Sequence, residues 1–289
     1  MMRLTTTTLV AMLALVRADD TTKEACDETA DYYAKASHYD LLWGDDNLHF
    51  GYFPHLDGST KVRLTQKQAA TELTERMLRM AGVTKGTKVL DLGAGKGRAC
   101  VDIAESTGAS CFGLDLTPQN IERAFELKKA HPHLSLDFAV GSFAALPADV
   151  LAAGPFDVVV SQVAFCHAHL LLKTIFQQTA LVMGPSSVLL VNDYLGSEDV
   201  YSEATKKHVF ERLHFETLLG PSEWLSTAFA AGLTLKQYHN LDAHIQTAYQ
   251  DMARDAAMHG NTNISTAYAA TAQAAENRQI GMNLALFTL

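Results

Sequence analysis

Residues 89–97, with the sequence Val-Leu-Asp-Leu-Gly-Ala-Gly-Lys-Gly, constrain the fold of this 289-residue chain more than any other segment. An apolar run leads into three alternating glycines, Gly93, Gly95 and Gly97, and a stretch with helical periodicity follows. Glycine permits a tight turn and lets a ligand approach the backbone, because a Cβ atom there would collide with it. The segment therefore predicts a strand, a turn and a helix, with a ligand at the carboxyl end of the strand.

Short apolar runs alternate with amphipathic stretches along most of the chain. Parallel strands are joined by crossovers long enough to hold a helix, so this alternation favours a parallel sheet covered on both faces. We predict an α/β fold with a doubly wound, seven-stranded, mostly parallel sheet and an N-terminal helical cap. The expected strands are 88–91, 109–115, 134–140, 156–161, 187–192, 233–241 and 280–289. The expected helices are 65–80, 97–106, 118–129, 168–183 and 221–231, with a polar, alanine-rich helical stretch at 247–278 outside the sheet.

The first 18 residues differ in character from the rest of the chain. They hold Arg3, a threonine-rich stretch and an apolar run at 9–16 that is too short to span a bilayer as a helix. This pattern is typical of a targeting segment and indicates the secretory pathway or an organelle; without such a segment the chain would be cytoplasmic. We expect residues 19–85 to form cap and lid helices and residues 86–289 to form the core, with cap and core packed as one unit.

Charge and cysteine content exclude several classes of partner. The chain has 23 Lys and Arg residues against 32 Asp and Glu residues, a formal net charge of −9. This balance disfavours nucleic acid and anionic lipid as partners, and we expect no stable membrane insertion. The four cysteines show neither Cys-x-x-Cys nor metal-ligand spacing, so we expect no metal site and no disulfide framework. The expected partner is a small molecule, bound by a monomer or a homodimer.

Acidic residues on the first two expected strands indicate the kind of ligand. Asp115 ends the second strand, where a carboxylate can accept hydrogen bonds from both ribose hydroxyls of a nucleoside. Arg98 stands where a dinucleotide fingerprint requires its third glycine, which disfavours a nicotinamide oxidoreductase. Asp91 suits a cationic amino acid group and is a poor neighbour for pyrophosphate. A cationic ligand with a ribose describes S-adenosyl-L-methionine; the alternative is a plain tight turn with Asp115 as a helix cap.

The pattern Asp-x-Gly-x-Gly-x-Gly, followed by an acid after the second strand, resembles the first motif of class I S-adenosyl-L-methionine-dependent methyltransferases. Within that class the chain is similar to the sarcosine and dimethylglycine N-methyltransferases, which form glycine betaine. This likeness rests on segments 43–52, 141–147 and 161–167 and extends weakly to the last strand. The resemblance implies a Rossmann-like fold, S-adenosyl-L-methionine as cofactor, and methyl transfer to an amine.

Two departures from that family leave the acceptor open. Val163 stands where the family carries an acid, and the segment 246–248 lacks the family's histidines. Phosphobases, thioether acids, quinols or tocopherols, and sterols are therefore alternative acceptors, because enzymes for such molecules share the His-x-Gly-Tyr/Phe segment. A non-catalytic S-adenosyl-L-methionine-binding protein is the alternative from a different functional class.

Further cofactor contacts are expected just beyond the second and third strands. Leu116 follows Asp115, while Ser142 and Phe143 stand where the adenine would lie in this fold. For Phe143, a place in the core is an equal alternative.

Methyl transfer to an amine is a direct displacement, so the protein has to align the reactants and exclude water. His167, just beyond the fourth strand, is the candidate base for a protonated amine; the alternative is that it packs or caps the next helix. Gln162 ends that strand and is expected to point toward the methyl group and the cofactor. We expect Cys166 to be a packing residue.

Acceptor contacts are expected from the cap and from the fifth strand. Aromatic faces hold methylammonium groups well, so Tyr33, Trp43 and Tyr52 are candidates, with a place in the core as the alternative for each. His49 is expected to bond the carboxylate or hydroxyl of the acceptor. The end of the fifth strand supplies two more candidates by its position at the ligand edge, Asp193 and Tyr194.

Overall fold

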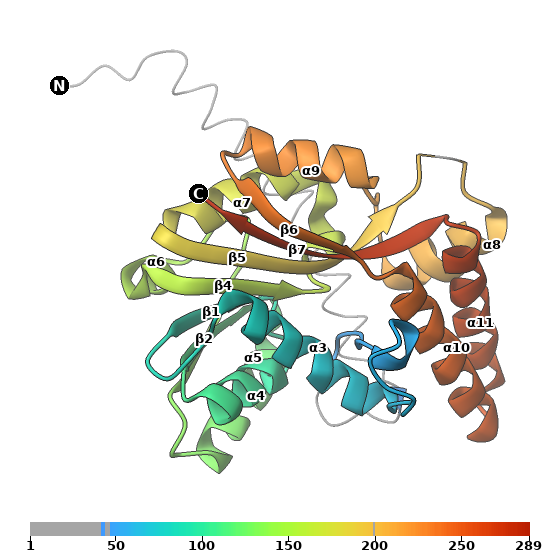
Figure 1. Ribbon diagram of the computed structural model, residues 1–289, viewed down its shortest axis with the longest axis horizontal. Coiled ribbons are helices and arrows are strands. Elements are labelled where there is room, and N and C mark those ends of the chain that lie inside the picture. The colour runs from blue at the N-terminus through green and yellow to red at the C-terminus, as the bar shows by residue number, and fades with distance from the viewer. Residues whose placement is uncertain (1–41, 44–46, 199) are drawn as a thin grey trace.

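The computed structural model describes residues 42–43, 47–198 and 200–289, and their strands form one seven-stranded sheet (Figure 1). The expected targeting segment, residues 19–41 and 44–46 of the expected cap, and with them Tyr33, lie outside the described residues. The strand order is β3-β2-β1-β4-β5-β7-β6. The strands are β1 Lys88–Leu92, β2 Ser110–Asp115, β3 Leu136–Val140, β4 Phe156–Gln162, β5 Met183–Gly196, β6 Thr234–Asn240 and β7 Ile280–Thr288.

The sheet is mostly parallel, as predicted. Strands β1 to β5 pair in parallel, whereas β7 runs antiparallel to both β5 and β6. The chain passes from β1 to β2 and on to β3 at one edge of the sheet. It then returns to form β4 on the other side of β1. This reversal of direction places the carboxyl ends of β1 and β4 beside each other, which is where open α/β sheets bind ligands.

Helices cover both faces of the sheet. They are α3 Gln66–Ala81, α4 Arg98–Thr107, α5 Pro118–Ala130, α6 Ala148–Ala153, α7 Leu172–Leu181, α8 Glu203–Thr205, α9 Pro221–Ala230, α10 Asp242–Met258 and α11 Thr262–Glu276. Short 3₁₀ turns lie at Pro54–Leu56 and Phe165–Leu171, and a π-helical turn lies at Lys206–Glu211. Figure 1 shows α6, α7 and α9 on one side of the sheet and α3, α4 and α5 on the other, with the α10–α11 pair beyond one end.

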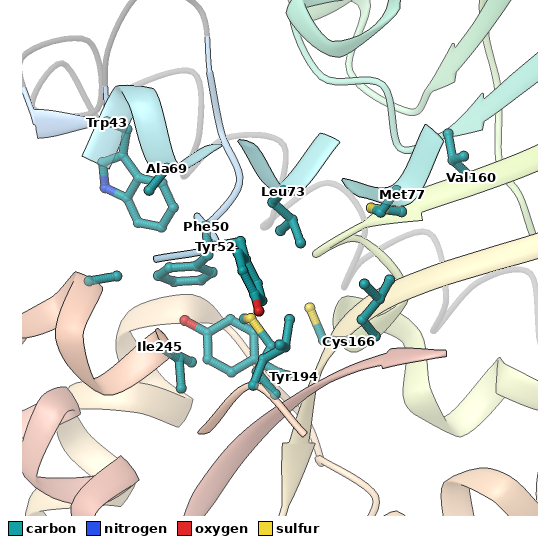
Figure 2. Close-up of a cluster of buried hydrophobic side chains, with 14 of the residues drawn as sticks. Trp43, Phe50, Tyr52, Ala69, Leu73, Met77, Val160, Cys166, Tyr194 and Ile245 are labelled. Atoms are coloured by element: carbon teal, nitrogen blue, oxygen red, sulfur yellow. The ribbon is translucent and has the colours of Figure 1, made fainter. Parts of the chain in front are cut away.

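The sheet has one hydrophobic core on each face. Alternate residues of a strand contribute to different cores, because successive side chains in a strand point to opposite faces. Val158 and Val160 of β4 face the helices α3, α4 and α5, whereas Val159 faces α6, α7 and α9. Figure 2 shows part of the first of these cores, in which Tyr194 of β5 lies beside Phe50, and Leu73 of α3 belongs to the same cluster. Helix α3 is thereby packed over the ligand edge of the sheet. A capping box at Thr65 fixes its first turn.

Several local features differ from the sequence prediction. The helix expected at 168–183 is a 3₁₀ turn followed by α7, because the backbone at Ala168 is not helical, with φ −142° and ψ 37°. Strand β5 begins at Met183, earlier than expected, because Met183 pairs with Phe156 across an irregularity in the β4 register. Helices α6 and α8 were not predicted. The alanine-rich stretch is helical and lies outside the sheet, as expected.

One disulfide, Cys100–Cys111, joins α4 to β2 in the part of the chain that the structure describes. The cysteine spacing, from which we expected no disulfide framework, had not indicated this pair. The reason is that the pairing depends on tertiary packing: α4 lies against β2 and brings the two Cα atoms to 5.4 Å, a distance that a disulfide can span. Among the described helices, none is both long and apolar enough to cross a bilayer.

Candidate active site

The glycine turn joins β1 to α4 through left-handed backbone conformations. Gly93, Gly95 and Gly97 have φ angles of +87°, +54° and +84°, a region that residues with a Cβ adopt only with strain. The backbone N–H of Gly93 donates to the carbonyl of Leu114 at 2.8 Å, which ties the turn to the end of β2. A Cβ on Gly93 would lie 2.2 Å from the Cβ of Ala164. The predicted strand, turn and helix are therefore confirmed. At Gly93, Ala164 of the same chain leaves no room for a larger residue.

Asp115 ends β2 with its carboxylate facing this turn. Its Oδ2 accepts a hydrogen bond from the backbone N–H of Gly95 at 2.8 Å. Its Oδ1 accepts from the N–H of Thr117 at 2.9 Å and from Nδ2 of Asn120 at 3.1 Å. Burial raises the pKa of Asp115, and these hydrogen bonds act in the opposite direction. The sequence prediction correctly brings Asp115 to the glycine turn.

Asp91 lies in β1 just before the turn and is only 2% exposed. Burial and, to a lesser degree, the charge of Asp115 raise the pKa of Asp91 to about 7. No ion pair with another described residue offsets the cost of its charge. A buried carboxylate in this position gains strongly from a cationic ligand, whose charge favours the ionised form.

A narrow pocket with about 30 Å³ of free volume lies over Asp91 and the turn. It is lined by Asn47, Leu48 and His49 of the cap and by Asp91, Gly93, Ala94, Gly95, Lys96, Arg98, Ala99 and Gln162 of the core. The Leu48 side chain lies against the turn, 3.1 Å from where a Cβ of Gly95 would be. This volume is far smaller than a nucleoside needs, so the described pocket matches only part of such a ligand.

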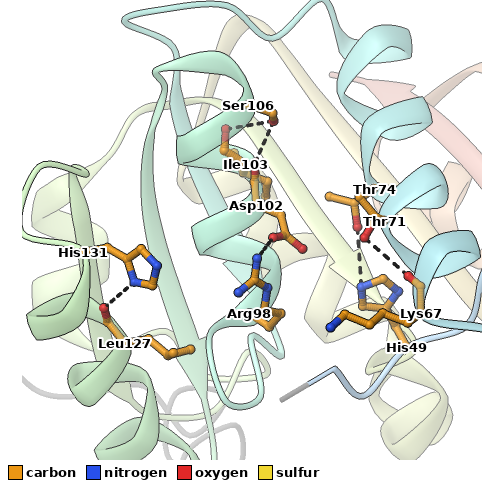
Figure 3. Close-up of polar contacts among 10 residues, drawn as sticks. All are labelled: His49, Lys67, Thr71, Thr74, Arg98, Asp102, Ile103, Ser106, Leu127 and His131. Atoms are coloured by element: carbon orange, nitrogen blue, oxygen red, sulfur yellow. Dashed lines mark hydrogen bonds and ion pairs between the residues drawn. The ribbon is translucent and has the colours of Figure 1, made fainter. Parts of the chain in front are cut away.

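Two predicted residues, His49 and Gln162, meet at the wall of this pocket through a third that the sequence did not single out. The hydroxyl of Thr74 lies 3.3 Å from Oε1 of Gln162. It also lies 3.5 Å from Nε2 of His49, a contact that Figure 3 shows. The Nδ1 of His49 donates to the carbonyl of Phe50 at 2.8 Å. Burial lowers the pKa of His49, so its imidazole is neutral at pH 7. The sequence feature that could have indicated Thr74 is its position as a polar residue among the buried apolar residues of α3.

His167 lies in the 3₁₀ turn after β4, outside the pocket lining. Its ring centroid is 5.0 Å from that of Phe215. Burial, followed by the neighbouring charges of His169 and His214, lowers the pKa of His167 to about 4. The structure thus gives His167 a packed environment, and such a low pKa makes a weak proton acceptor.

Asp193 and Tyr194 close β5 but bond within the chain. Asp193 is fully buried, and its carboxylate accepts from the backbone N–H of Cys166 at 3.1 Å and lies 3.2 Å from Nε2 of His169. The hydroxyl of Tyr194 is hydrogen-bonded to that of Tyr249. Neither residue lines the pocket over Asp91. Their predicted contact with the acceptor stays a prediction.

The cap aromatics pack against the core in the described structure (Figure 2). Trp43 is 3% exposed and donates from Nε1 to the hydroxyl of Tyr268 at 3.0 Å. Tyr52 stacks on His244, with 4.3 Å between ring centroids, and carries the guanidinium of Arg76 at 4.4 Å on its ring. This corresponds to the core alternative for both Trp43 and Tyr52.

The remaining cofactor candidates lie at the expected edge of the sheet. Leu116 directly follows β2 and is half-buried. Ser142 follows β3, and its hydroxyl accepts from the backbone N–H of Ala144 at 3.1 Å. The ring of Phe143 packs edge-on against Phe165, with centroids 5.2 Å apart. These positions agree with the sequence prediction, while the contacts with adenine stay predictions.

An open, mostly parallel sheet with a glycine turn after β1 and acids on β1 and β2 defines a nucleoside-binding α/β protein of the class I methyltransferase type. Residues 83–241, more than half of the chain, match the family model described as a methyltransferase domain. The chain belongs to this methyltransferase domain family.

Individual relatives differ in what their names say they methylate. The glycine/sarcosine/dimethylglycine N-methyltransferase of Actinopolyspora halophila is 27% identical over 246 residues, which cover 77% of this chain and 40% of the relative. The 2-methyl-6-phytyl-1,4-hydroquinone methyltransferase of Synechocystis sp. is 28% identical over 215 residues, covering 72% of this chain and 62% of the relative. This chain thus spans less than two thirds of either relative. A mycolic acid cyclopropane synthase solved with SAH superposes with a TM-score of 0.76 at 16% identity, over 89% of this chain and 95% of that one.

The cofactor of this class is S-adenosyl-L-methionine, and the site fits it. Asp91 is a buried carboxylate with a raised pKa, suited to the amino acid part of such a ligand. Asp115 stands at the end of the neighbouring strand, where its Oδ2 has one hydrogen bond and can accept another from a ribose hydroxyl.

Proposed function

We propose that this chain transfers a methyl group from S-adenosyl-L-methionine to the amine of a small acceptor of the sarcosine and dimethylglycine class. The observation that carries this proposal is the meeting of His49 and Gln162 at the wall of the pocket over Asp91. The Actinopolyspora relative, whose name gives glycine, sarcosine and dimethylglycine as acceptors, supports the same class.

The cofactor residues are assigned by their place at the edge of the sheet. Asp91 and the backbone of Gly93 and Gly95 hold the amino acid part, and Gly97 allows the close approach of α4. Asp115 with Leu116 holds the ribose, and Ser142 with Phe143 contacts the adenine. Segment 47–49 then closes over the ligand and excludes water, which favours displacement over hydrolysis.

When bound, the cofactor supplies an electrophilic methyl group on a sulfonium. An ammonium acceptor has to lose a proton before its nitrogen can form the new N–C bond while the S–C bond breaks. A neutral imidazole at the pocket can take that proton. His49 lines the pocket over Asp91 with its Nε2 beside the hydroxyl of Thr74, whereas His167 lies outside the pocket lining. We therefore assign the base to His49, with His167 as the second candidate.

A quinol is the second candidate acceptor. The hydroquinone methyltransferase of Synechocystis matches nearly as much of this chain as the N-methyltransferase does. The core beside the cap is rich in aromatic side chains, including Phe50, Trp43 and Tyr194, which suits an aromatic acceptor. A phenol would lose its proton to the same imidazole.

The test is product analysis by mass spectrometry after incubating the full chain with S-adenosyl-L-methionine and single acceptors. The panel holds sarcosine, dimethylglycine, phosphoethanolamine, a thioether acid and a quinol. We expect a methyl gain on sarcosine or dimethylglycine, and loss of that gain in Asp91→Ala. Methylation of the quinol alone would establish the second candidate. Cofactor binding without methylation of any panel member would overturn the proposed acceptor class.

A further inference from the structure

Thr74 is an unusual polar residue because of where its hydroxyl points. It lies in α3 between buried apolar residues such as Leu73 and Met77, and it is 2% exposed. Threonine hydroxyls in helices commonly bond a carbonyl one turn back, as that of Thr71 does with Lys67 O at 3.4 Å (Figure 3). Both hydrogen-bond partners of the Thr74 hydroxyl, in contrast, lie on other elements: His49 in segment 47–49 and Gln162 at the end of β4. Thr74 therefore links segment 47–49, α3 and the sheet at the pocket wall.

The hydroxyl of Thr74 has one proton and two acceptors competing for it. Nδ1 of His49 faces the carbonyl of Phe50 at 2.8 Å, and a carbonyl can only accept, so Nδ1 carries the proton. Burial keeps the ring neutral, which leaves Nε2 as a bare acceptor. Asp102 of α4, ion-paired with Arg98, is the charged group that acts on His49, and its charge raises the pKa by less than burial lowers it.

Two arrangements of the hydrogen bonds satisfy this geometry. In the first, Thr74 donates to Oε1 of Gln162, and Nε2 of His49 is free to take a proton. In the second, the amide of Gln162 is turned so that its NH₂ donates to Thr74, and Thr74 donates to Nε2. The two arrangements present different groups to the pocket. The first presents the unprotonated Nε2 of His49 and the NH₂ group of Gln162, and the second presents the amide oxygen of Gln162.

We propose that Thr74 is a positioning residue whose hydroxyl sets the proton-accepting state of His49 and the orientation of the Gln162 amide. The catalytic part of this inference rests on the proposed function, in which His49 takes a proton from an ammonium acceptor. The first arrangement favours an acceptor that carries both an ammonium and a carboxylate group, because it presents a proton acceptor and a hydrogen-bond donor together. The structural part, the hydrogen bond between Thr74 and His49, is independent of any reaction.

The structural part is tested by ¹⁵N NMR of histidine-labelled full chain, with the His49 signals assigned from His49→Gln. We expect Nδ1 protonated and Nε2 at a shift between free and fully hydrogen-bonded values, because two acceptors share one proton. Thr74→Val, which keeps the shape of the side chain, should move Nε2 to the free value, and Thr74→Ser should restore it. Gln162→Leu should move the ¹⁵N shift of Nε2 toward the fully hydrogen-bonded value, since the Thr74 hydroxyl then has His49 as its single acceptor. Thr71→Val is the matched control and should change nothing at His49.

An unchanged Nε2 shift in Thr74→Val, or an unprotonated Nδ1 in the wild type, would overturn the proposal. Thermal unfolding checks that each variant is folded, and Gln162→Leu decides the question if Thr74→Val does not fold. In the activity arm, Thr74→Val should lower kcat/KM for the acceptor by about 10- to 100-fold, with the affinity for S-adenosyl-L-methionine within about twofold and rescue by Thr74→Ser. A wild type that shows the NMR pattern but methylates no amine refutes the proposed function and leaves the hydrogen bond established. Methylation with unchanged kcat/KM in Thr74→Val refutes the positioning role alone.

Discussion

Replacing Asp91 with Asn is expected to stabilise the fold while weakening cofactor binding. In the folded chain the pKa of Asp91 is about 7, against 3.8 for an ordinary aspartate. Between these values the folded chain holds a proton that the unfolded chain has released, so the free energy of unfolding falls as the pH rises from about 4 to 7. A shift of about 3 units at 1.36 kcal/mol per unit amounts to about 4 kcal/mol at pH 8. Asparagine has the shape of the protonated acid and avoids this cost.

The assay is urea unfolding of wild type and Asp91→Asn at pH 4 and pH 8, with cofactor affinity from calorimetry. We expect similar stability at pH 4 and a variant that is more stable by up to about 4 kcal/mol at pH 8. Affinity for S-adenosyl-L-methionine should fall by at least about tenfold, because the charged partner of its ammonium is lost. Asp137→Asn, at an exposed acid of β3, is the control and should show neither effect. A stability difference that is the same at both pH values would refute the assignment of a costly buried charge to Asp91.

Three further substitutions test the site and the fold. Asp115→Ala should leave the fold intact and weaken S-adenosyl-L-methionine binding by about 10- to 100-fold, since hydrogen bonds to a charged group contribute about 1.5–3 kcal/mol; unchanged affinity by calorimetry would remove Asp115 from the site. His167→Gln should keep turnover within about threefold between pH 6 and 9, because a group with a pKa of about 4 is a weak base, and a large loss that grows toward acid pH would assign it the proton. Gly97→Ala should destabilise the fold by about 2 kcal/mol or more in thermal unfolding, because its Cβ would lie 2.8 Å from that of Ala124 at a φ of +84°. Gly58→Ala has a similar φ of +79° but open space around the Cβ, so an equal loss there would show that packing at Gly97 adds nothing.

Features set by local sequence were predictable. The turn at Gly93 to Gly97 and the acid at Asp115 follow from residue spacing along a strand, and the structure brings them together as expected. The seven strands were also predictable, because apolar runs and their separations reflect burial on both faces. Their boundaries shifted where a partner strand extended the pairing, as at Met183.

Features set by tertiary packing were not predictable in the same way. The Cys100–Cys111 bond forms because α4 packs on β2, which no spacing rule encodes. Thr74 becomes notable only when the cap and β4 are placed around it. Conversely, the end of β5 marked Asp193 as a ligand contact by position, but His169 and the backbone of Cys166 already engage its carboxylate.

The antiparallel strand β7 has a consequence for how proteins of this architecture can diversify. The chain leaves the sheet at Asn240, forms α10 and α11, and re-enters at Ile280 on the strand next to its point of departure. Both ends of this excursion are thus anchored side by side, so it can change in length or sequence without disturbing the crossovers around β1 and β2. Because α10 also touches α3, such changes reach the helix that carries Thr74. Segment 241–279 is therefore a unit that a chimera can replace while β1, β2 and the glycine turn between β1 and α4 keep their sequence.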